Sequence, residues 1–304
     1  MSSFILSEYQ ARAQYIPYQQ WHIACFSPFD LHADSQDIAS LPVVVFLHGF
    51  PSASSDWHAQ WDALKDTHHC IGLDFLGFGV SDKPYPHAYS LHEQADIVTA
   101  LFARLVALGI TNVHLVAHDY GVSVAQELLA RQHHQALSLT LDSVVFMNGG
   151  LFADLHQPLM TQKLLKSPLG GFISLLMSKR TLATGFKKIF GPHTPPETAL
   201  IDELWILLNV HQGRRVLPKL LHYIDERFTY AQRWQDALSQ AKIPLTFING
   251  VYDPISGQHM LDEFEQLLPE THNTPLHVGH YPQIEAPEAV TQALREFWAK
   301  LSSH

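Results

Sequence analysis

The chain has 304 residues, of which 46% are hydrophobic and 16% are charged, and its formal net charge is -10. This length can bury one large core, or a core with an inserted subdomain. The acidic balance argues against a phosphate-binding face and therefore against nucleic acid as a partner. The sequence has no run of about 18 apolar residues, so we expect no membrane-spanning helix.

Two further features bear on the compartment. Residues 1–20 lack the basic region and apolar core of a secretory signal peptide. The two cysteines, Cys25 and Cys70, are too few for a disulfide framework. We therefore predict a cytoplasmic protein.

Short apolar runs alternate with helical patterns along most of the chain. The first run, residues 43–47, lies between Pro42 and Gly49. Continuous apolar runs of this length are typical of strands that are buried on both faces of a parallel sheet. Similar runs recur at 69–75, 113–117, 139–147 and 245–249.

The clearest helical pattern begins after Ser90. Ser90 and Glu93 match a capping box, apolar residues follow at helical spacing, and Gly109 ends the pattern. Further helical patterns cover 122–133, 257–268 and 287–301. Alternating strands and helices predict an α/β fold with a doubly wound, mostly parallel sheet.

The alternation stops between Gly150 and Arg233. This stretch has a helical pattern throughout, prolines divide it into short pieces, and the strand rhythm returns at Ile243. We predict a core domain formed by residues 1–149 and 234–304, with a helical cap domain at 150–233 inserted between its two parts.

A short segment between a strand and a helix carries the strongest chemical signal. Residues 117–121 read Ala-His-Asp-Tyr-Gly. A central acid or hydroxyl residue flanked by small residues is typical of a nucleophile elbow, although an Asp in this place can also be a plain helix N-cap. The central residue is usually Ser, but here it is Asp119, whose carboxylate is ionised near neutral pH and can displace a leaving group from a saturated carbon.

Two residues nearer the C-terminus complete a candidate triad. His280 lies on a loop before the last helix, where it can act as a general base, and Asp253 follows the strand at 245–249, where it can orient the imidazole. All three residues follow strands, and the carboxyl edge of a parallel sheet is where ligands bind. We predict the triad Asp119, Asp253 and His280.

The loop after the first apolar run offers one side of an oxyanion hole. It reads His48-Gly49-Phe50-Pro51. In this arrangement the backbone N–H groups of Phe50 and of Tyr120, the residue after the nucleophile, would stabilise an oxyanion. We expect His48 to contact the substrate.

No cofactor or metal is predicted. The glycine-rich segment at 77–84 lacks the third glycine of a dinucleotide-binding loop. The paired histidines His68-His69 and His133-His134 do not match a metal-ligand spacing.

Four motifs together carry a resemblance to a known family. They are His-Gly-Phe-Pro at 48–51, Gly-Phe-Gly-Val-Ser-Asp-Lys-Pro at 77–84, His-Asp-Tyr-Gly at 118–121 and Gly-His-Tyr-Pro-Gln at 279–283. They resemble α/β hydrolases of the epoxide hydrolase and haloalkane dehalogenase group over most of the chain. Within that group the sequence is most similar to the mesoderm-specific transcript protein subfamily, which also has Asn-Gly-Gly at 148–150. The resemblance implies an α/β-hydrolase fold with an inserted helical cap.

The resemblance also bears on the triad acid and on the leaving group. Some relatives carry the acid at the position of Asn148, so the Asn here favours Asp253. Dehalogenases of this group usually have Trp after the nucleophile to hold the halide, and haloacetate-type relatives have Arg, whereas this chain has Tyr120. Resembling epoxide hydrolases use tyrosines of the cap as proton donors, and the candidates are Tyr223, which we prefer, and Tyr230.

We therefore predict a hydrolase that opens epoxides to diols through an alkyl-enzyme ester on Asp119, with a small apolar substrate. One alternative is a haloalkane dehalogenase that uses Trp205 of the cap as a halide donor. The other is an α/β-hydrolase domain that binds a ligand without catalysis. Neither the oligomeric state nor the substrate identity follows from the sequence.

Overall fold

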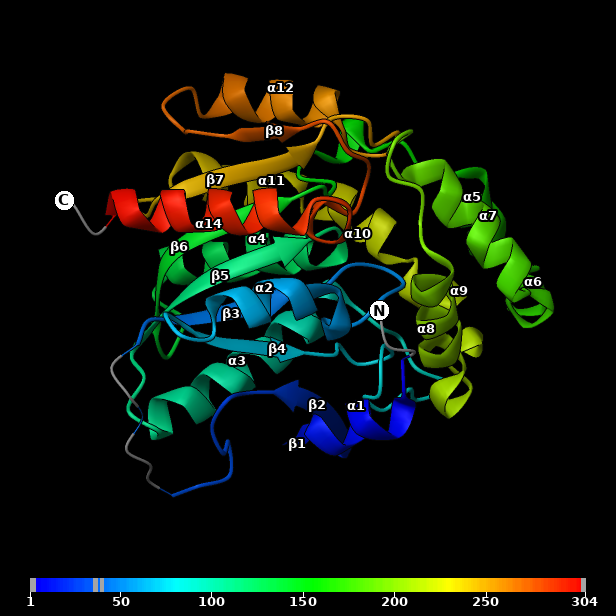
Figure 1. The fold of residues 1–304 in the computed structure, drawn as a ribbon, viewed down its shortest axis with the longest axis horizontal. Coiled ribbons are helices and arrows are strands. Elements are labelled where there is room, and N and C mark those ends of the chain that lie inside the picture. The colour runs from blue at the N-terminus through cyan, green and yellow to red at the C-terminus, as the bar shows by residue number, and fades with distance from the viewer. Residues whose placement is uncertain (1–3, 35–37, 39–40, 302–304) are drawn as a thin grey trace.

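A computed structural model describes residues 4–34, 38 and 41–301. Its centre is an eight-stranded sheet with the order β1-β2-β4-β3-β5-β6-β7-β8 (Figure 1). β1, β2 and β4 pair antiparallel, and every pair from β4 to β8 is parallel. The strands are β1 (Gln14–Tyr18), β2 (Trp21–Phe26), β3 (Val43–Leu47), β4 (His69–Leu73), β5 (Asn112–His118), β6 (Thr140–Met147), β7 (Leu245–Gly250) and β8 (Thr274–Leu276).

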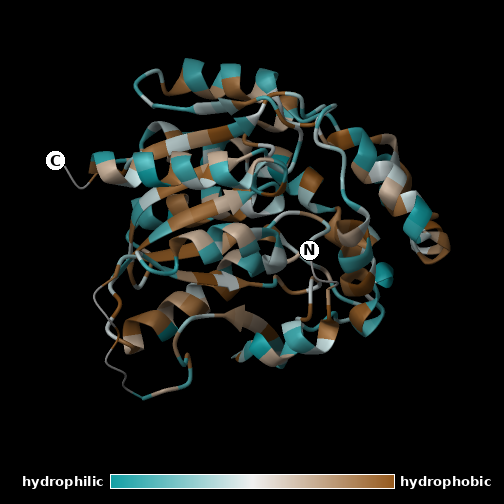
Figure 2. Cartoon of the chain, in the orientation of Figure 1, coloured by the Kyte–Doolittle hydropathy of each residue, from teal (hydrophilic) through white to brown (hydrophobic). Residues whose placement is uncertain are grey.

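Helices cover both faces of the sheet because the central strands are apolar on both sides. In β3, Val43, Val45 and Leu47 face one core cluster, and Val44 and Phe46 face the other. The first cluster is closed by α3 (Leu91–Ala107), α4 (Tyr120–His133), α11 (Ala231–Ser239) and α12 (Gln258–Leu267). The second is closed by α2 (His58–Leu64) and α14 (Pro287–Leu301). The layers of apolar strand residues are visible in Figure 2.

The predicted doubly wound, mostly parallel sheet is confirmed, and so are all five predicted strands. Of the two hydrogen bonds of the predicted capping box, one forms. Ser90 Oγ accepts a hydrogen bond from the Glu93 backbone N–H, but the Glu93 carboxylate binds His87 Nε2 instead of reaching back to Ser90.

The antiparallel edge formed by β1 and β2 was not predicted. Pro17 lies within β1, where proline is unusual, and Ile16 is the one buried residue of β1. The segment therefore shows little of the apolar pattern that is typical of a strand.

Between β6 and β7, the described residues form helices and connecting loops. The α-helices of this stretch are α5 (Met160–Lys166), α6 (Gly170–Leu176), α7 (Lys179–Ile189), α8 (Thr198–Asn209), α9 (Leu217–Leu220), α10 (Tyr223–Thr229) and α11. Its 3-10 helices are η2 (Ala153–Leu155) and η3 (Val210–Arg215). Helices α1 (Leu6–Arg12), η1 (Ser54–Trp57) and α13 (Pro282–Glu285) lie outside this stretch.

Helices α5 to α9 lie beyond the arrowheads of the strands, over the carboxyl edge of the sheet (Figure 1). The division into a core and a cap stays a prediction. Its boundary at residues 233 and 234 falls within α11, which packs on α4 through a hydrogen bond from Trp234 Nε1 to Glu127.

Buried Lys83 joins the core to these helices. Its Nζ donates to the backbone carbonyls of Leu207 and Val210, at the end of α8, over 2.7 Å and 3.1 Å. Among the described residues, no helix is long and apolar enough to cross a membrane.

Candidate active site

Asp119 occupies a sharp turn between β5 and α4. Its backbone has φ 43° and ψ -100°, a conformation that is strained for a residue other than glycine. The turn needs glycines on either side of the carboxylate. A Cβ at Gly121 would lie 2.7 Å from the carbonyl oxygen of Leu47, and a Cβ at Gly49 would lie 3.0 Å from Cβ of Asp119. The neighbouring backbones can therefore approach Asp119 closely.

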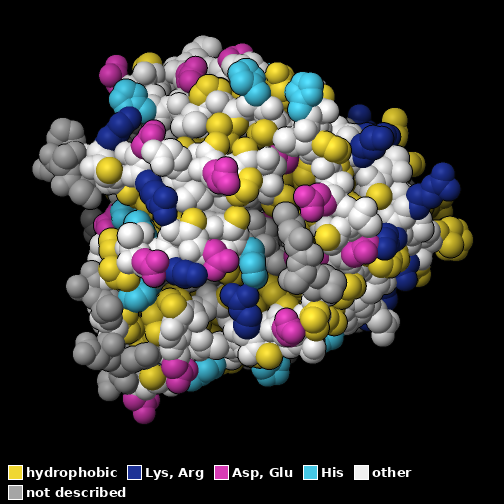
Figure 3. Space-filling view, viewed as in Figure 1, with side chains coloured by type: hydrophobic (Ala, Val, Ile, Leu, Met, Phe, Trp, Pro, Cys, Tyr) yellow, Lys and Arg dark blue, Asp and Glu magenta, His cyan; other side chains and the backbone are white. Residues whose placement is uncertain are grey.

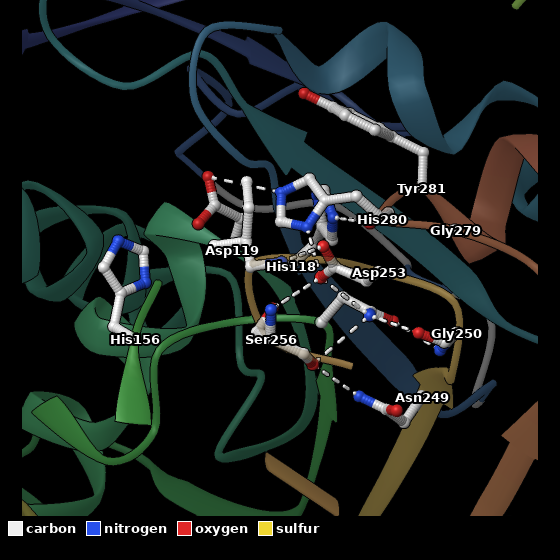
Figure 4. A network of polar contacts seen from close by, with 12 residues as sticks. His118, Asp119, His156, Asn249, Gly250, Asp253, Ser256, Gly279, His280 and Tyr281 are labelled. Atoms are coloured by element: carbon white, nitrogen blue, oxygen red, sulfur yellow. Dashed lines mark hydrogen bonds and ion pairs between the residues drawn. The ribbon is translucent and has the colours of Figure 1, made fainter. Parts of the chain in front are cut away.

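The three predicted triad residues come together (Figure 4). His280 Nδ1 is 2.7 Å from Asp253 Oδ2, and His280 Nε2 is 3.9 Å from Asp119 Oδ2. All three side chains are buried. The imidazole thus lies between two carboxylates, with one nitrogen directed at each.

Asn148 supports Asp253. Asn148 occupies the position at which the resemblance places the triad acid of some relatives. Its Nδ2 donates to Asp253 Oδ2 over 3.0 Å. The same oxygen accepts from Ser256 Oγ over 2.7 Å, and Asp253 Oδ1 accepts from the Ile255 N–H. These donors fix the carboxylate, which in turn fixes the ring of His280.

The charges of the triad shift its pKa values. Burial alone would lower the pKa of His280, but the Asp253 and Asp119 carboxylates outweigh burial and raise it to about 10. Burial would raise the pKa of Asp119, but the contact with His280 and the charge of Arg227 hold it below its ordinary value. Asp119 is therefore ionised and His280 is protonated at neutral pH, a state suited to nucleophilic attack by the carboxylate.

The loop that carries His280 is held by two residues outside the triad. His118 Nε2 donates to the carbonyl oxygen of His280 over 2.7 Å, and the Glu285 carboxylate accepts from the N–H groups of Gly279 and Tyr281. Burial lowers the pKa of His118 to about 3, so its ring is neutral. Both residues position His280.

The candidate oxyanion donors lie on the core side of Asp119. The Phe50 N–H donates to Asp119 Oδ2 over 3.0 Å. Tyr120 is the first residue of α4, where N–H groups have no acceptor within the helix. Tyr281 Oη donates to the carbonyl oxygen of Phe50, which ties the oxyanion loop to the His280 loop.

A buried arginine approaches Asp119 from the cap side, and sequence reasoning missed it. Arg227 of α10 is 1% exposed; its Nη2 donates to the carbonyl oxygen of Asp119 over 3.0 Å and lies 3.6 Å from Oδ1. Its Nε donates to Ser123 Oγ, and the backbone of Gly150 leaves room for the guanidinium. The sequence shows only an arginine directly after Asp225 and Glu226 in a helical segment, which does not reveal its partner.

His156 is the second residue that sequence reasoning missed. Its Nδ1 lies 3.2 Å from Arg227 Nη1, so Nδ1 accepts and the proton is on Nε2. Burial and the charge of Arg227 lower the pKa of His156 to about 3. The Nε2–H is a buried donor with no hydrogen-bond partner among the described residues. In Figure 4, His156 lies on the opposite side of Asp119 from His280.

Tyr223, the predicted donor of the cap, lies beside Arg227. The guanidinium carbon is 4.5 Å from the centre of the Tyr223 ring, which also contacts the rings of Phe50 and Tyr120. The Tyr223 hydroxyl is buried and, like His156 Nε2, has no hydrogen-bond partner among the described residues. Burial and the charge of Asp119 raise the pKa of Tyr223, which keeps the hydroxyl protonated.

Three other expected site residues are placed differently. Both ring nitrogens of His48 are used, one with the carbonyl oxygen of Gly49 and one with the N–H of Phe75, so it braces two loops and offers no donor to a substrate. The Tyr230 ring packs against His92 and Trp234. The structure does not bring Tyr230 to Asp119.

Trp205 of α8 is also not brought to Asp119. Its ring lies 5.2 Å below the Arg214 guanidinium and packs against the apolar cluster of the cap. A residue at helical spacing in the cap could face either the site or its neighbours, and the sequence does not distinguish the two. Elsewhere, no group of three or more His, Cys, Asp or Glu side chains within residues 4–34, 38 and 41–301 is placed to hold a metal ion.

Comparisons with known proteins agree with the fold, and they show that the chain belongs to the α/β hydrolase family. A family described as the alpha/beta hydrolase family matches residues 44–293. The mesoderm-specific transcript homolog protein of Homo sapiens is 40% identical over 276 residues, which cover 88% of this chain and 82% of that protein.

Two further matches carry specific names. A cis-3-alkyl-4-alkyloxetan-2-one decarboxylase of Shewanella oneidensis is 26% identical over 266 residues, which cover 84% of this chain and 81% of that protein. Among solved structures, a haloalkane dehalogenase variant from Bradyrhizobium elkanii has a TM-score of 0.75 at 21% identity, and covers 95% of this chain and 97% of its own. At that identity, the likeness to the dehalogenase shows the fold alone.

Proposed function

We propose that this protein hydrolyses epoxides to diols through an ester on Asp119. It belongs to the α/β hydrolase family and is related to the mesoderm-specific transcript proteins. One observation carries the proposal. The Asp119 carboxylate lies between a water-activating side, made by His280 and the Phe50 N–H, and a side that bears two unpartnered donors, Tyr223 Oη and His156 Nε2. A site that only binds a ligand has no need of this arrangement.

The two oxygens of Asp119 have different surroundings. Oδ2 accepts from the Phe50 N–H, and Oδ1 faces Arg227 on the cap side. In the proposed first half-reaction, Oδ1 attacks a carbon of the epoxide, the ring C–O bond breaks, and the departing oxygen takes a proton from Tyr223 Oη. Oδ2 becomes the carbonyl oxygen of the ester.

The charges favour this order of events. Ester formation removes the negative charge of Asp119, which contributes to the raised pKa of both Tyr223 and His280. The pKa values of both groups then fall, so Tyr223 donates more readily, and the extra proton of His280 can pass to the tyrosinate. Arg227 remains as a buried cation beside the departing oxygen.

In the second half-reaction, water attacks the ester carbonyl carbon. His280 Nε2, now neutral, takes a proton from this water while Asp253 holds Nδ1. The oxyanion that forms at Oδ2 accepts hydrogen bonds from the Phe50 and Tyr120 N–H groups. Loss of one such donor typically slows this kind of reaction by ~10²–10³-fold. The ester bond then breaks, and the departing alkoxide takes the proton of the new carboxyl group. The diol leaves, with Asp119 ionised and His280 protonated as at the start.

The leaving group is proposed to be oxygen because of the donors on the cap side. An alkoxide is a poor leaving group that needs a proton, and a buried phenol provides one. A halide is held by N–H donors instead. His156 Nε2–H is one such donor, but the residue after the nucleophile is Tyr120, and Trp205 lies elsewhere in the cap.

A second candidate reaction is the opening of a four-membered lactone. The relative from Shewanella oneidensis is named for decarboxylation of an oxetan-2-one, which is also a strained ring with an oxygen leaving group. Attack by the same carboxylate oxygen would open this ring, and the same donors face the departing oxygen.

A substrate panel separates these reactions. The protein is incubated with styrene oxide, an alkyl epoxide, 1-bromobutane and a cis-dialkyl oxetan-2-one, and the diol, bromide and alkene products are measured. Diol from an epoxide, absent with Asp119→Ala, supports the proposal. Bromide release without epoxide turnover supports a dehalogenase, alkene formation alone supports the lactone reaction, and no turnover of any substrate supports a binding role.

A further inference from the structure

The helical hairpin formed by α5 and α6, together with the start of α7, exposes large apolar side chains at one end of the molecule. Leu169, Phe172 and Leu176 are 67%, 66% and 67% exposed. Their spacing of three and four residues places them on one face of α6. The other large exposed apolar residues of this hairpin are Met160, Leu164 and Leu175. Isolated exposed apolar residues are ordinary, but a contiguous group marks an interaction surface.

The charge of the same segment is opposite to that of the whole chain. Residues 155–196 contain six Lys and Arg residues and no Asp or Glu, in a chain of net charge -10. Figure 3 shows Lys and Arg side chains beside the apolar side chains at the right edge of the molecule. The exposed members of this basic set are Lys163, Lys179, Arg180, Lys187 and Lys188.

We propose that this surface, the α5–α6 face, docks the protein on an anionic lipid bilayer. Apolar side chains on one helix face, surrounded by lysine and arginine, are the features of helices that lie in a membrane interface. The basic residues would approach lipid phosphates, while Phe172 and Leu176 enter the acyl boundary. The surface needs no membrane-spanning helix, and it lies on the cap above the carboxyl edge of the sheet (Figure 1).

The charge pattern favours a bilayer over a second copy of this chain. A second copy would have to present an acidic, apolar surface to the basic hairpin, or bring two basic hairpins together. The hairpin's own acidic contacts lie at its border, where Lys166 binds Asp225 and Lys179 binds Asp202. An anionic bilayer satisfies both the apolar and the basic parts of the surface at once.

Vesicle flotation of the whole protein tests the proposal. The protein is mixed with vesicles of phosphatidylcholine, or of phosphatidylcholine and phosphatidylglycerol in equal parts, at about 0.1 M and about 1 M salt, over which the screening length falls from about 10 Å to about 3 Å. We expect it to float with the anionic vesicles at low salt, and much less with the neutral vesicles or at high salt.

Two variants separate the apolar and basic contributions. Phe172→Ser combined with Leu176→Ser is expected to lower partitioning about 100-fold, because two exposed side chains lose their apolar contact with the bilayer. Lys163→Gln combined with Arg180→Gln, two exposed basic residues of α5 and of the start of α7, is expected to lower partitioning roughly 30-fold on anionic vesicles only. Phe228 is an exposed residue of α10 outside the hairpin, so Phe228→Ser is the matched control and should leave the partitioning unchanged.

All the substituted side chains are exposed, so the variants keep the core packing, and circular dichroism checks the fold. Absence of the protein from the floating fraction with anionic vesicles overturns the proposal. So does equal flotation of the Phe172 and Leu176 variant. Concentration-dependent dimers in sedimentation, abolished by that variant without any vesicle binding, would assign the surface to a second copy instead.

Discussion

The carboxyl edge of the sheet and the inner face of the cap meet at Asp119, but they are built in different ways. At the sheet edge, each chemical group follows a strand within a short motif, and its hydrogen-bond partners come from neighbouring loops of the core. On the cap side, Arg227 and His156 come from separate segments and meet through packing. The edge is therefore specified locally and the cap side by tertiary contacts.

The two sides also divide the proposed reaction. The sheet edge holds the ester carbonyl and activates water, and the cap side receives the departing oxygen. Under the proposed mechanism, the sheet edge cleaves the ester whatever the leaving group, and the cap side selects the leaving group. Substitutions on the two sides should therefore slow different half-reactions.

The largest expected effect is that of removing the nucleophile, which both sides share. Asp119→Ala should abolish turnover of the best epoxide substrate, with a loss of at least ~10⁴-fold, because no other group can form the ester. Steady-state diol formation measures the loss. A variant that retains a tenth of the activity would mean that Asp119 acts only as a positioning group.

On the sheet edge, His280→Gln should block the second half-reaction. Asp119 needs no deprotonation, so the ester still forms, but water is not activated and the alkyl-enzyme accumulates. Rapid quenching and intact-protein mass should show one equivalent of adduct. If the variant turns over without an adduct, or forms none with a substrate that the unmodified protein consumes, then His280 acts before the ester.

On the cap side, Tyr223→Phe should slow ester formation by ~10²-fold or more, as is typical for loss of a general acid. Tyr230→Phe is the matched control, because its ring packs against His92 and Trp234. Single-turnover kinetics report ester formation separately from ester hydrolysis. A slow step confined to ester hydrolysis, or an equal loss with Tyr230→Phe, would remove Tyr223 from the donor role and leave His156 as the donor.

Arg227→Met is expected to have the smallest effect on the rate at neutral pH, but a clear effect on the pH dependence of the rate. The contact with His280 and, after it, the positive charge of Arg227 hold the pKa of Asp119 below its ordinary value, so the pKa rises when Arg227 is removed. The acid limb of ester formation should then move to higher pH. Rates measured from pH 3 to pH 8 test this, and an unchanged acid limb contradicts it.

The same substitution has a consequence for stability. The folded pKa of Asp119 lies below its unfolded value, so the stability that it contributes is present above the unfolded pKa of about 3.9 and is lost as the pH falls through the folded pKa. At neutral pH, Arg227→Met should therefore lower the free energy of unfolding by about 3–5 kcal/mol, because it leaves a buried carboxylate with one cation fewer. Arg233 is partly exposed and shares Glu127 with other donors, so Arg233→Met should lower the free energy of unfolding by less than about 1 kcal/mol.

The sequence predicted the central parallel strands and brought out Asp119, Asp253 and His280, because each is marked locally by an apolar run followed by a turn. It did not predict β1, where Pro17 breaks the pattern, nor did it reveal that His48 braces loops. Arg227 and His156 were missed because a buried arginine and a neutral histidine have no sequence signature. Their roles depend on a contact between segments 71 residues apart.

Labelling with ¹⁸O tests most directly the central claim that Asp119 is a covalent nucleophile. The protein, in excess, turns over an epoxide once in H₂¹⁸O, and the diol and the peptide containing Asp119 are analysed by mass spectrometry. Water attacks the carbonyl carbon of the ester, so we predict an unlabelled diol and one ¹⁸O in the Asp119 carboxylate. A labelled diol in the first turnover, with Asp119 unlabelled, would show that water attacks the substrate directly and would contradict the ester mechanism.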